Sequence, residues 1–230
     1  MQVVLSPSRV SPRNVCPVSG LTRQEEILNA VTHGLGLLGC IGGTVVLLVL
    51  AAQRGTGWQI LGVSVFGGAL VLLYGVSTSY HSAWSVRWKR VLQVVDHMSI
   101  FALIAGSYTP FALGPLRGPW GWSLLGVIWS LAMAGIVFKL IVGNRFAVLS
   151  TLAYILMGWL VVIAFGHLAA ALDTPSLIML ALGGVAYTVG AGFYLWDERI
   201  RYFHPIFHVL VLVGSACHYW VVLEYVRNLA

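Results

Sequence analysis

Three histidines carry the chemistry that this sequence indicates most clearly. His204 and His208 are four residues apart in the run HPIFH, so on a helix both imidazoles project from the same face. Such a pair is a common way for one helix to supply two nitrogen ligands to a metal ion. Pro205 is compatible with this, because its missing N–H falls in the first helical turn, where no intrahelical partner exists. Two histidines without a common function can also stand four residues apart, so the pair alone leaves that alternative open.

A third nitrogen is available from His81, which ends an earlier apolar stretch. Ser77 lies one turn before it in the run STSYH and shares its face. Three nitrogens and a water form the ligand set of a catalytic zinc with an open position, whereas a structural zinc is normally closed by four protein ligands. Taken alone, a histidine in the position of His81 is in most proteins a residue of the membrane interface and not a metal ligand.

Asp96 is a carboxylate within the apolar run VLQVVDHMSIFALIAG, with no adjacent cation. An intramembrane carboxylate is costly and normally has a partner and a function. The alternative, which the sequence weighs equally, is that Asp96 only accepts hydrogen bonds from a neighbouring helix. His97 follows directly but points about 100° away around a helix, so the two cannot face one site equally.

Other polar residues are weaker candidates. Glu26, Asn29 and His33 share one helical face; we interpret Glu26 as a helix-start residue that reaches the interface, and His33 as deep enough to line the same cavity. His167 falls near the opposite end of its apolar stretch. His218 lies roughly 21 Å along the helix from His204, at 1.5 Å per residue. Neither is expected to share the metal.

The composition predicts helices in a membrane. Of the 230 residues, 59% are hydrophobic and 9% charged, and the mean hydropathy is +0.89; a soluble domain carries about 25% charged residues. Lipid leaves only helices or a closed barrel, and apolar runs of about 20 residues favour helices. The net charge of +6 comes without a basic cluster interleaved with aromatics, so we expect contact with membrane lipids and not with nucleic acid.

The apolar stretches predict an all-α integral membrane protein, a bundle of seven transmembrane helices over residues 27–230. Residues 1–26 contain three prolines and are expected to form a flexible cytoplasmic tail and not a signal peptide. The three cysteines are too few and too scattered for a disulfide framework. The expected spans are 27–52, 58–81, 91–113, 120–141, 146–172, 175–196 and 204–226. The oligomeric state is left open.

The basic residues predict the orientation. Ten of the thirteen Lys and Arg residues fall on the side that holds the N-terminus, and only Arg54, Arg117 and Arg227 fall on the other. The positive-inside rule then places the N-terminus inside, the C-terminus outside, and the chain in the cell membrane. With this topology His81, Asp96 and His204 reach the same depth, near the cytoplasmic ends of three helices.

These motifs, taken as a set, resemble the bacterial hemolysin III proteins, which belong with the progestin and adiponectin receptor family. The resemblance rests on E-x-x-N-x-x-T-H from Glu26, S-x-x-x-H from Ser77, D-H-x-x-I-F-x-L-I-A-G-S-Y-T-P from Asp96 and H-P-I-F-H from His204. The motifs keep the family's order and cover nearly the whole chain after the tail. The resemblance implies a seven-helix bundle, an intracellular N-terminus and a zinc ion near the cytoplasmic face. It assigns His81, His204 and His208 to the zinc, with Ser77 and Asp96 beside it.

The resemblance also extends, distantly, to alkaline ceramidases, which are similar to zinc-dependent lipid amide hydrolases. The leading hypothesis is therefore a membrane-embedded zinc hydrolase of a lipid amide or ester, in which Asp96 accepts a proton or positions water and Ser77 orients water or donates to the oxyanion. The second hypothesis is a non-enzymatic regulator or sensor of membrane lipid composition with a structural zinc, and the third is a pore-forming cytolysin. A transporter is least favoured, because neither broken helices nor a midplane ionic site is evident.

Overall fold

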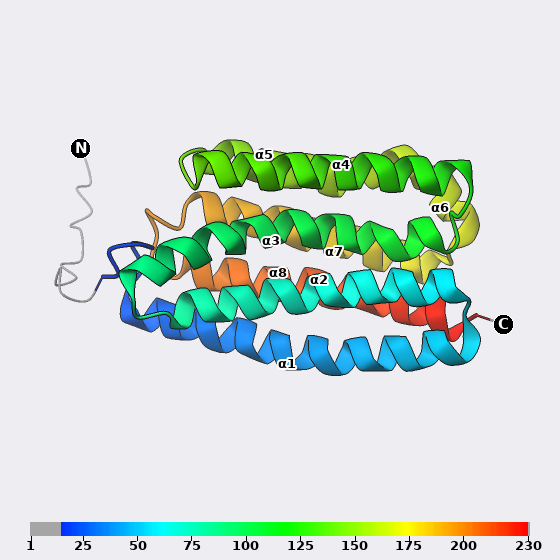
Figure 1. Ribbon diagram of the computed structural model, residues 1–230, viewed down its shortest axis with the longest axis horizontal. Helices are drawn as coiled ribbons and strands as arrows, with labels where there is room; N and C mark the ends of the chain where they lie inside the picture. The colour runs from blue at the N-terminus through cyan, green and yellow to red at the C-terminus, as the bar shows by residue number, and fades with distance from the viewer. Residues whose placement is uncertain (1–14, 230) are drawn as a thin grey trace, which may run out of the picture.

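The computed structural model describes residues 15–229 and confirms the helical membrane architecture (Figure 1). Seven helical segments in this range are long and apolar enough to cross a membrane. They are α1 (Arg23–Arg54), α2 (Gly57–Ser82), α3 (Val86–Leu113), α4 (Pro119–Val142), the fifth segment Ala147–Ala171, α7 (Thr174–Leu195) and α8 (Phe203–Arg227). The described part of the chain contains no strand beyond an isolated bridge between Val15 and Thr22.

The first helix begins before the predicted span, because its N-terminus is capped. Thr22 and Glu25 form a capping box: the Glu25 side chain accepts the Thr22 N–H at 3.0 Å, and the Thr22 hydroxyl accepts the Glu25 N–H at 3.4 Å. Residues 15–22 form a short turn that leads into this cap. Of the predicted flexible tail, residues 1–14 lie outside the described range.

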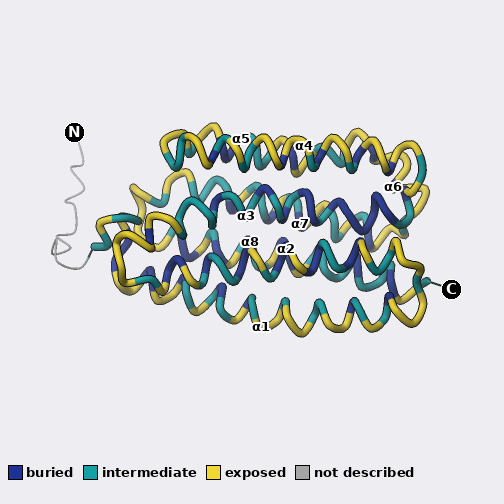
Figure 2. The backbone as a smooth tube through the Cα atoms, in the orientation of Figure 1, coloured by how far each residue is buried: buried dark blue, intermediate teal, exposed yellow. Residues whose placement is uncertain are grey.

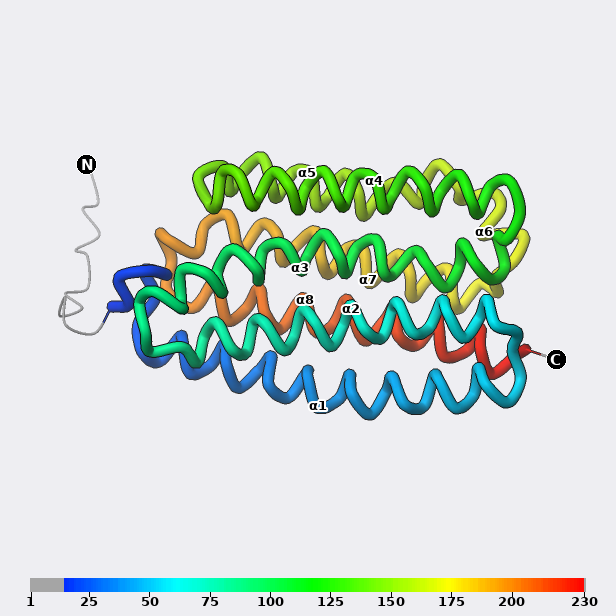
Figure 3. Tube along the Cα trace, viewed as in Figure 1, coloured from blue at the N-terminus to red at the C-terminus, as the bar shows by residue number. Residues whose placement is uncertain are grey.

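The helices run up and down, so alternate loops meet at the same end of the bundle (Figure 3). α1 packs between α2 and α8, α3 packs on α2 and α4, and α7 packs on α8. In the view of Figure 1 the start of α1, the α2–α3 loop and the α7–α8 loop lie together at the left end. The predicted convergence of these helix ends is therefore confirmed; which side of the membrane they face stays a prediction.

The first and last long helices are joined at both ends of the bundle. At one end, the Glu25 carboxylate accepts the Tyr202 N–H at 2.7 Å, just before α8 begins. At the other end, the Arg54 guanidinium donates to the Arg227 carbonyl at 2.6 Å. These two contacts link the N-terminal helix α1 to the C-terminal helix α8 at both of their ends.

The outer surface of the bundle is apolar, as lipid contact requires. Large hydrophobic side chains such as Leu35 and Leu38 of α1 are 66% and 68% exposed. Buried residues, dark blue in Figure 2, are most frequent in α2, α3 and α8 and least frequent in α1 and α4. Buried polar groups gather at the end where α1 starts, and they include His33, His81, His204 and His208.

The fifth membrane segment differs from its prediction as one continuous helix over residues 146–172. It consists of α5 (Ala147–Trp159), a 3₁₀ turn η2 (Leu160–Ala164) and α6 (Phe165–Ala171). The hydroxyl of Tyr108, on α3, enters the helical ladder: it accepts the Val161 N–H at 2.8 Å and lies 2.9 Å and 2.7 Å from the Met157 and Gly158 carbonyls, to which it donates. A side chain inserted in the ladder is a recognised cause of a helix break.

The expectation of unbroken helices is therefore wrong for this segment. The break nevertheless lacks the ionic site that a transporter of this kind would need. Within residues 15–229 the ion pairs lie at helix ends, between Glu26 and His81 or Lys89, between Asp197 and His204, and between Glu224 and Arg227.

Candidate metal centre

The three predicted ligands meet where α2 ends and α8 begins. One nitrogen from each of His81, His204 and His208 lies within 4.8 Å of the other two. The ring centroids are 5.2 Å apart for His81 and His204, and 4.8 Å apart for each of the other two pairs. All three side chains are buried. The arrangement inferred from the H-x-x-x-H spacing and from the topology is thus present.

The start of α8 has a conformation that aims its two histidines inward. Tyr202 caps the helix in the left-handed region, with φ of 66°, which is uncommon for a residue other than glycine. Its N–H is held by the Glu25 carboxylate at 2.7 Å. Pro205 occupies the first turn, as predicted, where it costs no hydrogen bond. The N-terminus of α1 therefore fixes the place where α8 starts.

The free nitrogens of these rings fit a metal ion. His81 Nε2, His204 Nε2 and His208 Nδ1 are buried and have no hydrogen-bond partner among the described residues. A buried polar atom without a partner is costly, and native proteins rarely keep three of them together. Imidazole nitrogens are ordinary ligands of zinc and other transition metals. The donor set therefore suits a metal ion with three protein ligands.

Two carboxylates hold two of the rings in the orientation that a metal requires. The Glu26 Oε2 atom lies 2.7 Å from His81 Nδ1, and the Asp197 Oδ2 atom lies 2.6 Å from His204 Nδ1. A carboxylate accepts a proton from Nδ1–H, which leaves the lone pair of Nε2 free for a metal. Both histidines are thus set in one tautomer by an acidic partner.

Glu26 is therefore not the interfacial residue that its position near a helix start suggested. Its side chain is buried and also contacts the Lys89 ammonium at 3.1 Å and the Ser19 hydroxyl. Lys89, counted from sequence as one of the basic loop residues, is itself buried and donates to the Tyr80 carbonyl at 2.9 Å. The carboxylate thus has three partners from three segments of the chain.

Ser77 and Asp96 lie beside the histidines, and His33 joins them. The Ser77 hydroxyl lies 2.8 Å from His33 Nδ1. The His33 ring stacks on His208, with ring centroids 3.6 Å apart and planes 20° apart. The Asp96 carboxylate faces Ser77 in the wall of the same cavity. The structure therefore brings both predicted catalytic residues to the site, and His33 lines the same cavity, as expected, where it contacts the Ser77 hydroxyl.

The remaining histidines lie apart from the three-histidine group. His97 Nδ1 is 2.6 Å from the Asn144 side-chain oxygen, and its ring sits against Tyr194. His167 contacts Trp120 at the other end of the bundle, with ring centroids 4.4 Å apart and ring planes tilted by 41°. His218 lies 3.3 Å from the Leu180 carbonyl. As expected, none of them belongs to the cluster of nitrogens that could hold a metal.

Two residues of the site carried too little signal in the sequence. Asp197 stands in the charged loop DERIRYF, where its neighbours Glu198 and Arg199 look equally suited to solvent. In the sequence Asn29 is only one member of a polar face, yet it is 0% exposed and both polar atoms of its amide lack a partner among the described residues. Only the folded loop and the packing of α1 on α8 distinguish these residues from ordinary surface groups.

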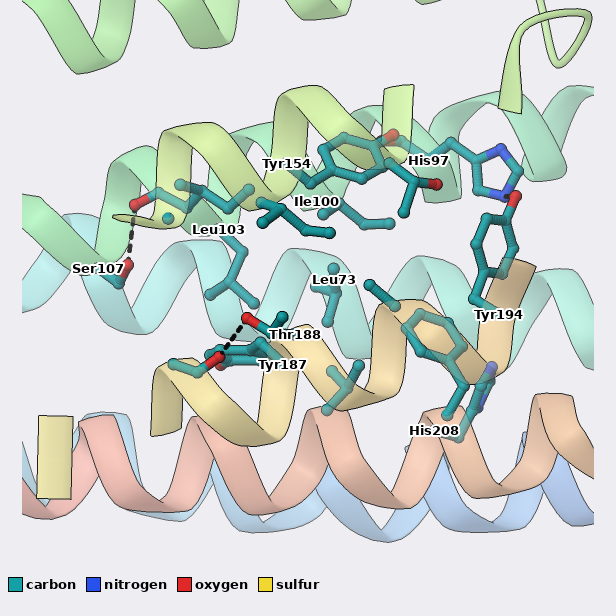
Figure 4. Close-up of a pocket in the computed structure, with 18 of the residues that line it drawn as sticks. Leu73, His97, Ile100, Leu103, Ser107, Tyr154, Tyr187, Thr188, Tyr194 and His208 are labelled. Carbon is teal, nitrogen blue, oxygen red and sulfur yellow. Dashed lines mark hydrogen bonds between the residues drawn. The ribbon is translucent and has the colours of Figure 1, made fainter. Parts of the chain in front are cut away.

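An apolar cavity of about 140 Å³ opens from the site into the bundle. His204, His208, Ser77 and Asp96 line it at one end. Figure 4 shows His208, Tyr194 and His97 at that end, then Leu73, Ile100 and Leu103, and Ser107 at the far end. A candidate metal site therefore stands at the polar end of a cavity whose length is lined mainly by hydrocarbon side chains.

Fold and site together define a multi-pass membrane protein with a buried three-histidine site at one end of a seven-helix bundle. The family model described as "Haemolysin-III related" matches residues 21–219. The chain belongs to the hemolysin III family, and the resemblance seen in its motifs is confirmed.

Relatives agree over nearly the whole length of the chain. A "Hemolysin-3 homolog" of Bacillus subtilis (strain 168) is 47% identical over 89% of this chain and 95% of its own. "Hemolysin-3" of Bacillus cereus is 43% identical over 88% of this chain and 92% of its own. The human "Monocyte to macrophage differentiation factor" is 30% identical over 89% of this chain and 85% of its own. No solved structure matches the chain.

Proposed function

We propose that this protein is a zinc-dependent hydrolase that cleaves an amide or ester bond of a membrane lipid. The observation that carries the proposal is the set of three buried, unpartnered imidazole nitrogens, next to Ser77 and Asp96, at the polar end of an apolar cavity. A hydrolase of lipids needs both features: a place for the reacting bond and a place for the hydrocarbon.

Zinc is the metal that this donor set favours. Three imidazoles, two of them hydrogen-bonded to carboxylates, match the ligand pattern of catalytic zinc, which keeps an open fourth position. When bound, zinc supplies a Lewis acid that polarises a carbonyl and lowers the pKa of water to about 7. Softer thiolate ligands are not at hand, since no cysteine stands in the described cluster.

The surrounding side chains have distinct roles in this proposal. Asp96 is positioned to accept a proton at its carboxylate, or to hold the attacking water by a hydrogen bond. The Ser77 hydroxyl, fixed by His33 Nδ1 at 2.8 Å, donates to the oxygen on which negative charge develops. Glu26 and Asp197 keep the His81 and His204 rings in place during turnover.

The hydrocarbon part of the substrate lies along the cavity. Leu73, Ile100, Leu103 and Val211 line it beyond the polar end. Because the chain moves from the hydrocarbon of the bilayer into an apolar cavity, packing against these side chains favours its binding, and not release from water. A lipid enters such a cavity from the bilayer without first crossing water, which suits a site inside a transmembrane bundle.

We place the protein in the cell membrane with the site near the cytoplasmic face. The support is the charge bias of the sequence: on the expected topology, ten of the thirteen Lys and Arg residues fall on the side of the N-terminus. The first turns of α3 at this end keep Arg87 and Arg90 exposed, although Lys89 is buried. Fusing a reporter to the N-terminus and to the C-terminus tests the orientation, because the proposal requires the first inside and the second outside.

The alternative function is a non-enzymatic sensor of membrane lipids, in which zinc only joins α2 to α8. It is favoured by the way the cluster ties the end of one helix to the start of another. The two functions differ in their need for Asp96, since a structural role leaves this carboxylate without a task.

Turnover by purified, zinc-loaded protein decides between these functions. We expect release of fatty acid from at least one member of a panel of acyl amide and ester lipids, including ceramide-like amides, and loss of this release in Asp96→Asn with zinc content unchanged. Zinc-loaded protein that releases no fatty acid from any of them contradicts the hydrolase. Release of a trapped dye from liposomes by the same preparation would instead point to the pore-forming cytolysin.

A further inference from the structure

A second cavity continues the first toward the opposite end of the bundle. It has a volume of about 230 Å³, and we call it the outer cavity, and the one at the histidine site the inner cavity. Both are lined by one shared set of residues, which we call the junction. The junction consists of Ser107, Tyr108, Gly158, Trp159, Gly184 and His218.

Polarity falls along the two cavities. The inner cavity begins at histidines, Ser77 and Asp96, and it still carries Tyr187 and Thr188 near the junction. The outer cavity beyond the junction is lined by aliphatic and aromatic side chains, among them Phe111, Leu116, Leu124, Phe165 and Leu168. A ligand that fills both must therefore have one polar end and a long apolar end, as a single-chain acyl compound does.

The length of the inner cavity is close to the length of one acyl chain of a membrane lipid. Asp96 and Ser107 lie on α3 and span the inner cavity; their separation along the helix is about 16 Å at 1.5 Å per residue. One leaflet, half of the hydrocarbon core of about 30 Å, is about 15 Å thick. A chain as long as those of the surrounding lipids therefore reaches the junction, and a longer chain must pass through it.

The junction is narrow, and two features keep it open. Gly184 on α7 has no side chain, and a Cβ added there would stand 3.6 Å from the Trp159 ring. Trp159 is fixed by its indole N–H, which donates to Thr188 Oγ1 at 3.0 Å. It stands at the last residue of α5, where Tyr108 breaks the helix. A larger side chain at position 184 would therefore fill the opening against a ring that is held in place.

We propose that the two cavities hold a single long acyl chain, whose tail passes the junction, and that Gly184 determines the chain length that the protein accepts. The proposal rests on the proposed function for the position of the polar end at Ser77 and Asp96. It adds the class of ligand, a single-chain acyl compound longer than one leaflet, and it assigns the outer cavity to the end of that chain.

Photo-cross-linking in the intact, purified protein tests this without any turnover. The probes are two fatty acids with a diazirine at the end of the chain, one of stearate length and one of decanoate length, and the labelled residues are found by mass spectrometry. In the wild type, the long probe is expected to label Leu124, Phe165 or Leu168, and the short probe Leu103, Ile104 or Tyr187. In Gly184→Leu, labelling of the outer cavity by the long probe should fall by about tenfold, because the added side chain fills the junction against the Trp159 ring and the tail can pass only at the cost of overpacking.

Gly192→Leu on the same helix is the matched control, because a Cβ there meets nothing within 4 Å and the residue lines neither cavity. It should leave both labelling patterns unchanged. Ser107→Leu fills the junction from α3 and is the second test if Gly184→Leu does not fold.

The outcomes separate this inference from the proposed function. Wild-type labelling confined to lipid-facing residues such as Leu182 or Val185 overturns the inference, and so does outer-cavity labelling that survives both junction variants. Labelling as expected without hydrolysis of any lipid supports the inference and contradicts only the hydrolase. Hydrolysis without labelling of the outer cavity contradicts only the inference.

Discussion

The two ends of the bundle are held together by different interactions. At the site end, helix termini meet through buried hydrogen bonds and ion pairs, such as those of Glu26 with His81 and Lys89. At the opposite end, helices meet through small residues and apolar contacts: a Cβ on Gly106 would stand 2.7 Å from the Cβ of Ala69, and Val222 and Val226 are 0% exposed. Polar contacts occur at the far end too, such as that of Arg54 with the Arg227 carbonyl, but this contact is exposed, whereas the polar contacts of the site end are buried.

This difference predicts where the metal-free protein is least stable. Helices in lipid gain little from burying apolar groups against each other, so close packing of small residues holds the far end. At the site end, the unpartnered nitrogens of three histidines lower the stability of the metal-free protein. Substitutions should therefore change metal binding at one end and folding stability at the other.

The largest expected effect is at the metal ligands. His208→Ala removes one of three nitrogens, so we expect about one zinc per chain in the wild type and a near-complete loss in the variant. Elemental analysis of the purified proteins measures this. His218→Ala, on the same helix but outside the cluster, should keep its zinc; equal zinc content in His208→Ala and the wild type would contradict the site.

The next effect concerns the two carboxylates that orient ligands. Asp197→Ala frees the Nδ1–H of His204, and we expect zinc affinity to fall about 10- to 100-fold, as competition with a chelator would show. Glu26→Ala should weaken zinc to a similar extent and lower the unfolding temperature as well, because it also leaves the Lys89 ammonium buried and unpaired.

The control for this pair is Glu198→Ala, next to Asp197 in the same loop and exposed. Its zinc affinity should equal that of the wild type. If Asp197→Ala binds zinc as tightly as Glu198→Ala, the carboxylate does not orient the ligand.

At the far end, a smaller effect should appear in stability alone. Gly106→Val forces α2 and α3 apart, so we expect destabilisation of about 1–3 kcal/mol with zinc affinity unchanged. Gly126→Val on α4 adds the same side chain where nothing lies within 4 Å, and it should have much less effect. Thermal unfolding in detergent compares the two variants. Equal unfolding temperatures would contradict the role of close packing at Gly106.

The smallest expected effect is at the break in the fifth segment. Tyr108→Phe removes the hydroxyl that accepts the Val161 N–H, so we expect a loss of about 1 kcal/mol and faster amide exchange around residues 157–161. Tyr154→Phe removes a single hydrogen bond, to the His97 carbonyl, and should leave exchange at 157–161 unchanged. Unaltered exchange in Tyr108→Phe would mean that another contact maintains the break.

Much of this architecture follows from the sequence, because lipid restricts the choices. Runs of about 20 apolar residues must be helices, and the alternation of their directions brings His81 and His204 to the same end. The four-residue spacing of His204 and His208 then fixes their common face. These inferences need only helix geometry and the order of the spans.

The parts that could not be predicted depend on loop conformation and on single side-chain contacts. Nothing in the charged loop after α7 separates Asp197 from Glu198 until the loop folds back on His204. Lys89 and Glu26 each resemble surface residues until they are seen paired. The break in the fifth segment contains no proline, and its cause is a tyrosine about fifty residues earlier in the chain.

The closure of α8 onto α1 has a consequence for the biosynthesis of the protein. α8 leaves the ribosome after the six other spans described, and it brings His204 and His208, two of the three candidate ligands, directly after Tyr202, the partner of Glu25. Until α8 inserts, His81 at the end of α2 lacks the two histidines that complete the cluster. Chains that stop short of α8 lack two of the three histidines of the candidate metal centre, so under the proposed function only chains whose α8 is inserted can acquire the metal.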